Sequence, residues 1–230
     1  MNRVTIDAVL LGKAVPFGPP GRTSAIAKTP VEGPRAVGTD GFLEDEQADR
    51  RVHGGPEKAV HHYPFDHHAA WREELGADLP LLGRPGAFGE NLSTLGLTEA
   101  DVCVGDVVRA GSALLQVAQA RQPCWKLNHR FGVPDMARRV QASGRTGWYY
   151  RVLEPGAIAR GDGMTLLERP YPAWPLDRLL HVLYVDTLNR AALAEMAALP
   201  VLAASWRALA ERRLERGAVE SWEGRLHGAT

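Results

Sequence analysis

Cys124 lies in a segment whose composition favours chemistry at sulfur. It follows Pro123 in the stretch ARQPCWKLN, residues 120–128. A proline restricts the preceding residue to extended backbone, whereas the residues after Cys124 can turn into a helix. Unpaired N–H groups at a helix start stabilise a thiolate, and Arg121 and Lys126 add positive charge nearby. The pattern predicts a reactive or ligand-binding thiolate, and a buried, inert cysteine is the alternative.

The other cysteine, Cys103, fits that inert alternative. It lies in DVCVGDVV, an apolar alternating stretch whose charged neighbours are both acidic. We therefore assign Cys103 to the core. Two cysteines do not make a disulfide framework, so both are expected to be thiols.

A second candidate segment is RRVHGGPEKAVHHYP, in which His53 precedes Gly54 and Gly55. Paired glycines let backbone approach a ligand closely or adopt positive φ, and Arg51 contributes positive charge. We interpret the segment as a loop that grips an anion or a polar heterocycle, with His53 as a donor or acid. A glycine turn with a solvated histidine is the alternative. A catalytic dyad of Cys124 with His53 also stays open, because such pairs meet in space rather than in sequence.

Two further segments add candidate residues. Lys28 ends the apolar stretch SAIAK, where the rim of a barrel is expected, and an ordinary edge lysine is the alternative. Asn91 lies in the turn GAFGEN. The histidine-rich stretch HHYPFDHH, residues 61–68, lacks carboxylates or cysteines at metal-ligand spacing, so we expect a partly exposed helix that carries imidazoles.

The elements that must position these residues are mostly short strands broken by glycine and proline. The predicted strands are residues 3–12, 24–32, 106–111, 113–120, 147–156 and 164–170. Their number and irregular spacing favour a closed or nearly closed barrel over a doubly wound sheet. Helices are predicted at 65–76, with Asp66 as N-cap, and at 133–144.

The chain changes character after the proline-rich stretch RPYPAWP, residues 169–175. Three sets of apolar residues recur at helical spacing, and the last set closes near Gly217. They predict a C-terminal three-helix domain, residues 171–230, after a barrel domain, residues 1–170. About 55 residues is near the lower limit for independent folding, so we expect these helices to lean on the barrel.

Charge and targeting signals narrow the functional classes. Lys and Arg number 27 and Asp and Glu number 27, which argues against stable nucleic-acid binding or adsorption to anionic membranes. The N-terminal residues lack the apolar run of a secretory signal, and no segment has the length of a membrane span. We expect a cytoplasmic protein.

Several motifs together resemble one known family. These motifs are SAIAK, VHGGPEKAVHHYP, AFGENLST, GLTEADVCVGD, RQPCWKLN, TGWYYRVLEPG and SWRALAERRLE. Their identity and order are similar to those of YiiM-type MOSC proteins, over about residues 6–226. The resemblance implies a mixed, mainly β fold: a MOSC-type β-barrel with inserted helices, followed by the small three-helix domain.

The resemblance further implies a molybdenum cofactor, in which a pterin carries molybdenum and Cys124 is the protein's thiolate ligand to the metal. The residues implied to contact this cofactor are Lys28, Arg51, His53, Gly54, Gly55, Asn91, Arg121, Cys124, Lys126 and Asn128. The implied activity is reduction of N-hydroxylated compounds such as 6-N-hydroxylaminopurine, with electrons from a separate flavoprotein reductase. His53 is the first candidate for the proton donor and Lys28 the second.

Two other functions stay open at this point. The chain could carry the cofactor, or sulfur on Cys124, without turnover of its own. It could also be a thiol enzyme that uses Cys124 with His53. A homodimer stays open as well.

Overall fold

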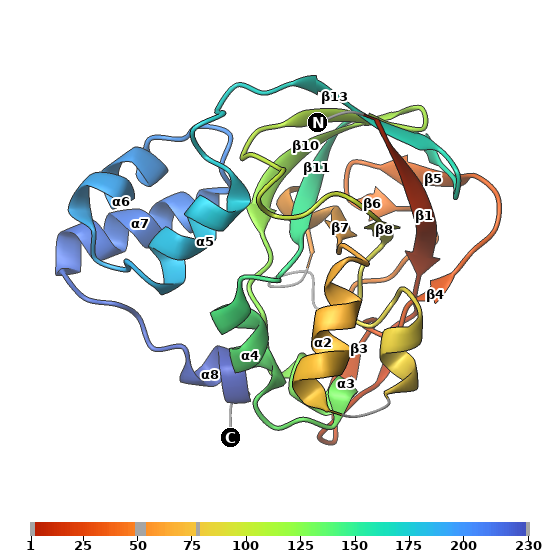
Figure 1. Cartoon of the computed structure of the whole chain (residues 1–230), viewed down its shortest axis with the longest axis horizontal. Coiled ribbons are helices and arrows are strands. Elements are labelled where there is room, and N and C mark those ends of the chain that lie inside the picture. Colours follow the sequence, from red (N-terminus) through yellow and green to blue (C-terminus); the bar gives the residue numbers. More distant parts are fainter. Residues whose placement is uncertain (1–2, 49–53, 77–78, 229–230) are drawn as a thin grey trace.

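The structure is a computed structural model that describes residues 3–48, 54–76 and 79–228. A β-barrel forms one part of the molecule, and α5, α6 and α7 lie together beside it (Figure 1). The strands are β1 Val4–Leu11, β2 Val15–Pro16, β3 Thr23–Ser24, β4 Thr29–Pro30, β5 Arg35–Gly38, β6 Gly41–Phe42, β7 Val60–His62, β8 Leu92–Thr94, β9 Val107–Ala110, β10 Ala113–Ala120, β11 Trp148–Glu154, β12 Gly156–Ile158 and β13 Gly163–Glu168. The helices are η1 Pro56–Lys58, α2 His67–Leu75, η2 Pro80–Gly83, α3 Lys126–Phe131, α4 Met136–Ser143, α5 Leu176–Tyr184, α6 Arg190–Ala197, α7 Ala204–Arg216 and α8 Glu223–His227.

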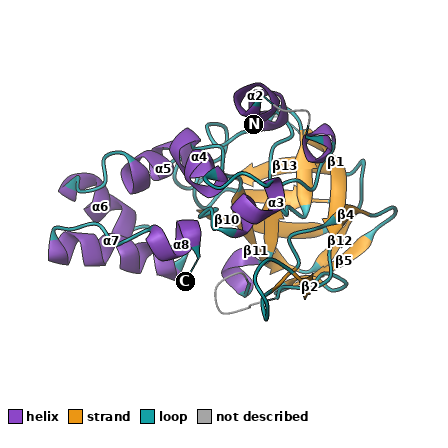
Figure 2. Ribbon diagram, turned by 90° about the horizontal axis from the view of Figure 1, so that it is seen from below, coloured by secondary structure: helices purple, strands orange, loops and turns teal. Residues whose placement is uncertain are grey.

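Seven strands close the barrel, which confirms the predicted fold class. They follow the order β13-β9-β10-β11-β7-β8-β1, and β1 pairs back with β13 through Val4 and Met164. β4 pairs with the C-terminal end of β1, at Leu10 and Leu11, and the strands surround a common interior (Figure 2). All these pairings are antiparallel except β7 with β8. Closure leaves the ring without an unpaired edge.

The burial of β10 shows how the two parts of the molecule pack. Its first residues alternate between buried and half-buried, as expected for a strand with one covered face, whereas its last four are all buried. The backbone N–H of Ala203, just before α7, donates to the carbonyl of Ala118 at 2.9 Å. The C-terminal helices therefore cover the outer face of β10, and one core contains Val117 of the barrel together with Leu180 and Trp206 of the helices.

The three predicted C-terminal helices correspond to α5, α6 and α7. Leu176, Leu180 and Leu183 are buried at the predicted spacing, and α7 ends at Gly217, which takes the left-handed conformation. The short helix α8 follows and was not predicted. None of the helices in the described part of the chain combines the length and apolar character needed to cross a bilayer.

One predicted strand is wrong. Residues 24–32 form only the ends of two short pairings, β3 and β4, and the chain between them is irregular. The side chain of Ser24 accepts a hydrogen bond from the N–H of Ile26 at 3.2 Å, a local bond that competes with strand pairing. Lys28 consequently lies on a loop rather than at the end of an apolar strand.

Candidate functional site

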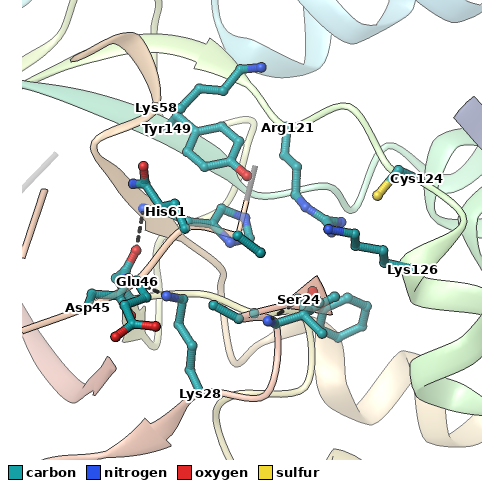
Figure 3. A pocket seen from close by; sticks show the side chains of 17 residues that line it. Ser24, Lys28, Asp45, Glu46, Lys58, His61, Arg121, Cys124, Lys126 and Tyr149 are labelled. Atoms are coloured by element: carbon teal, nitrogen blue, oxygen red, sulfur yellow. Dashed lines mark hydrogen bonds and ion pairs between the residues drawn. The ribbon is translucent and has the colours of Figure 1, made fainter. Parts of the chain in front are cut away.

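A pocket of about 570 Å³, counting its open mouth, is surrounded by loops from both halves of the barrel sequence (Figure 3). Such a volume is ordinary for a small-molecule or cofactor site. Its lining residues are Ser24, Ala25, Ile26, Lys28, Asp45, Glu46, Gln47, Ala48, Lys58, His61, Phe88, Gly89, Asn91, Arg121, Cys124, Lys126 and Tyr149. Most polar side chains among them are cationic or neutral donors, so the pocket suits an anionic ligand.

Cys124 lies in this lining, on the loop between β10 and α3, and is 8 % exposed. Lys126, buried at the start of α3, donates from Nζ to the carbonyl of Thr23 at 3.3 Å. Because α3 has only six residues, its dipole is that of a short helix, and the cationic side chains that share the pocket lining with Cys124 are Lys28, Lys58, Arg121 and Lys126. Burial lowers the pKa of the Lys58 ammonium, while Glu57 and Cys124 act in the opposite direction.

Arg121 and His61 bring donor groups into the middle of the pocket. The backbone of Arg121 is fixed by a 2.9 Å hydrogen bond from its N–H to the carbonyl of Gly147. Its guanidinium is buried, and Nη1 has no hydrogen-bond partner in the described part of the protein. His61 is 3 % exposed and stacks on Tyr149 with ring centroids 4.8 Å apart, and its Nε2 also lacks a partner among described residues.

The electrostatic state of His61 follows from its surroundings. Burial first, and then the nearby Arg121, push the pKa of His61 well below its ordinary value, so the ring is neutral at physiological pH. A neutral imidazole keeps one donor and one acceptor nitrogen. Buried polar atoms are normally paired, so the unpartnered Arg121 Nη1 and His61 Nε2 indicate a place where a ligand can bind.

A buried ion pair lies across the pocket from Cys124 in the view of Figure 3. It joins the Lys28 ammonium to the Asp45 carboxylate, which also accepts from Gly12 N–H at 2.7 Å and from Asn91 Nδ2 at 2.8 Å. Asn91 Oδ1 in turn accepts from the N–H of His61 at 3.1 Å. Burial lowers the pKa of Lys28, and Asp45 opposes that shift. This network holds Lys28 in place and makes its ammonium a stronger acid than an exposed one.

The structure brings together five of the predicted site residues. These are Lys28, Asn91, Arg121, Cys124 and Lys126. Arg51 and His53 lie outside the described residues.

Three predicted residues are not part of the pocket lining. Gly54 and Gly55 precede η1, where Gly55 has φ +87° and its carbonyl accepts from the N–H of Lys58 at 2.9 Å. The carbonyl of Gly55 thus helps to position Lys58, and a contact of these glycines with a ligand stays a prediction. The Asn128 side chain donates to the carbonyl of Leu226 at 2.8 Å and accepts from Ala137 N–H at 2.7 Å, so it ties helices together.

Asp45, Lys58, His61 and Tyr149 line the pocket but were not predicted as site residues. The expectation of a partly exposed helix over residues 61–68 is wrong for its first half, because His61 and His62 belong to the buried strand β7. The sequence signal that could have revealed this strand is the apolar pair Ala59-Val60 just before the histidines, which is typical of a strand that enters a core. Asp66 does precede α2, but its carboxylate accepts from Gly96 N–H at 3.0 Å instead of capping the helix.

Comparisons with known proteins agree with this architecture. Residues 49–165 match the MOSC domain, and residues 174–217 match the YiiM-like, 3-alpha helix domain. Protein YiiM of Escherichia coli (strain K12) is 38% identical over 235 residues, which is 98% of this chain and 99% of that protein. The chain belongs to the YiiM-type MOSC family.

A solved structure and one further relative extend the comparison of this YiiM-type chain. The crystal structure of YiiM from Escherichia coli superposes with a TM-score of 0.83 at 30% identity, over 99% of this chain and 100% of that one. A protein of Gibberella moniliformis named "Reductase" is 43% identical over 180 residues, which is 78% of this chain and 32% of that protein. The likeness to YiiM-type proteins therefore includes both the barrel and the C-terminal helices.

Proposed function

We propose that this YiiM-type protein is a molybdenum cofactor-dependent reductase of N-hydroxylated compounds such as 6-N-hydroxylaminopurine. Electrons would come from a separate flavoprotein reductase. The balanced change is R–NHOH + 2e⁻ + 2H⁺ → R–NH₂ + H₂O, in which the N–O bond breaks, an N–H bond forms and the oxygen leaves as water. The observation that carries the proposal is the pocket in which the Cys124 thiol shares a wall with Arg121 and Lys126.

The residues of the pocket suit the cofactor. Molybdenum prefers sulfur ligands, and Cys124 contributes a soft thiol to the pocket wall. No group of three or more His, Cys, Asp or Glu side chains in the described ranges converges as a metal site, so the metal would be held by the cofactor's own ligands together with Cys124. The unpartnered Arg121 Nη1 and His61 Nε2 suit the anionic and heterocyclic parts of such a group.

Each side chain then has a definite task. Cys124 would hold the metal, and Lys58, Arg121 and Lys126 would neutralise negative charge on the cofactor. When bound, the cofactor supplies the two-electron redox centre. Lys28, positioned by Asp45 and acidified by burial, is the proton donor that we propose among the described residues. His53 keeps its place as a predicted donor.

The name of the fungal relative supports the reductase class. That protein is named "Reductase", and its alignment with this chain covers 78% of this chain and 32% of the fungal protein. This chain would obtain its electrons from a separate protein.

The proposal is tested by producing the protein in two hosts, one able and one unable to make the cofactor. Each preparation is analysed for molybdenum and assayed with 6-N-hydroxylaminopurine and reduced viologen. Molybdenum and turnover confined to the competent host would support the proposal. Bound molybdenum without turnover would favour a cofactor carrier, and equal turnover from both hosts would favour a thiol enzyme.

A further inference from the structure

The C-terminal segment returns to the barrel after the three-helix domain. Its helix α8 lies beside α4 in Figure 1, on the side of the molecule where the chain ends. Both family matches end before it, at residues 165 and 217. The function of this segment is thus not explained by the pocket or by the helical domain.

Arg225 of α8 bonds to the backbone on both sides of Cys124. Its carbonyl accepts from the N–H of Trp125 at 2.8 Å, and its Nη1 donates to the carbonyl of Pro123 at 2.5 Å. Its Nη2 donates to Oε1 of Gln141, on α4, at 2.6 Å. The bond to Gln141 therefore orients the guanidinium, and the bond to the Pro123 carbonyl holds the cysteine loop.

Neighbouring contacts strengthen this attachment. Asn128, in α3, donates from Nδ2 to the carbonyl of Leu226 at 2.8 Å. A Cβ added to Gly228 would lie 3.4 Å from the indole of Trp125, so the end of α8 also packs on that ring. The segment from Arg225 to Gly228 thus contacts the residues just after Cys124 through hydrogen bonds and packing.

The cysteine loop needs such support because it lies between β10 and α3, outside the hydrogen-bond ladders of either element. Peptide groups outside regular structure require other partners, and a guanidinium supplies several donors in a fixed geometry. We propose that Arg225 is a positioning residue for Cys124: it clamps the flanking peptides so that the sulfur faces the pocket. The importance of that position rests on the proposed function, but the clamp itself is testable without the cofactor.

The test measures alkylation of cofactor-free protein by iodoacetamide, with peptide mass spectrometry to give separate rates for Cys124 and Cys103. Cys103 is 2 % exposed, its Sγ contacts the carbonyl of Pro172 at 3.8 Å, and it lies far from α8 in sequence. Its alkylation rate therefore reports general unfolding of the protein. For Arg225→Ala we expect the ratio of the Cys124 rate to the Cys103 rate to rise about tenfold, as local opening of the loop becomes easier.

Two further variants make the result decisive. Arg225→Lys keeps the charge but cannot bond to Pro123 and Gln141 together, so its ratio of rates should lie between those of the wild type and Arg225→Ala. If Arg225→Ala does not fold, Arg225→Lys provides the test. Glu223→Ala changes an exposed residue of the same helix and should leave the ratio unchanged. An unchanged ratio in both Arg225 variants would overturn the proposal. A raised ratio in a protein that never binds molybdenum would support the clamp and reject the proposed function.

Discussion

Cys124 and Cys103 are both buried, so burial alone does not separate a functional thiol from an inert one. Cys103 packs near the Pro172 carbonyl, and burial followed by Asp106 raises the pKa of its thiol. Cys124 instead lines a pocket together with Arg121 and Lys126. These different surroundings, predicted from the neighbouring charges in the sequence, are the reason why we propose Cys124 as the functional cysteine.

The buried Lys28–Asp45 pair provides the first prediction. Lys28→Met combined with Asp45→Asn removes the proposed proton donor without leaving a buried unpaired carboxylate. Turnover in the reductase assay should fall about 10²–10⁴-fold, the usual contribution of a general acid, while molybdenum content is retained. The control is Lys13→Met, which changes an exposed lysine paired with Glu46 at 3.0 Å and should leave turnover unchanged. Full activity of the double variant would remove Lys28 from this role.

At the scale of the elements, the packing of α7 involves a buried arginine, Arg213. Arg213 is 1 % exposed and donates to both Glu220 oxygens, at 3.0 and 2.8 Å, and to the carbonyl of Leu183 at 2.9 Å. It therefore joins α7 to the end of α5 and to the segment that leads to α8. A bidentate pair of this kind fixes geometry as well as charge.

Arg213→Ala should consequently destabilise the C-terminal helices. We expect the free energy of unfolding to fall by about 3 kcal/mol, since the partner Glu220 stays partly exposed and can be hydrated. The adjacent Arg212 is exposed, and Arg212→Ala should change stability by less than about 0.5 kcal/mol. Urea denaturation of both variants measures this difference, and equal stabilities would contradict the role of Arg213.

The elements also show what the sequence could and could not predict. Residues 113–120 form β10 as predicted, because a β-rich run of residues that follows a glycine turn is a local signal. The irregular loop at Lys28 was not predicted, since its conformation depends on Asp45 and Asn91, far away in sequence. His61 was missed because its role depends on contact with Arg121 and Tyr149, which only the closed barrel brings near.

At the scale of the whole molecule, buried histidines make stability depend on pH. Burial lowers the pKa of His62 from its usual value to about 3, and the ring bonds to Tyr150 and Thr94 at 3.1 and 2.9 Å. Between that value and the unfolded pKa of about 6.5, the unfolded chain binds more protons. Stability therefore decreases as pH falls through this range.

The expected loss attributable to His62 is about 2 kcal/mol between pH 7 and pH 5. His62→Gln should reduce the pH dependence of the unfolding free energy by that amount, whatever its effect at pH 7. Urea denaturation at the two pH values gives the difference. An equally steep dependence in the variant would show that His62 does not titrate on unfolding.

The central claim is that the sulfur of Cys124 holds a molybdenum cofactor in the cationic pocket. The most direct measurement is the molybdenum content of Cys124→Ser and Cys103→Ser variants, each purified from a host that makes the cofactor. We expect Cys124→Ser to lose both molybdenum and reductase turnover and Cys103→Ser to keep them. Wild-type turnover that depends on molybdenum and persists in Cys124→Ser would contradict this claim.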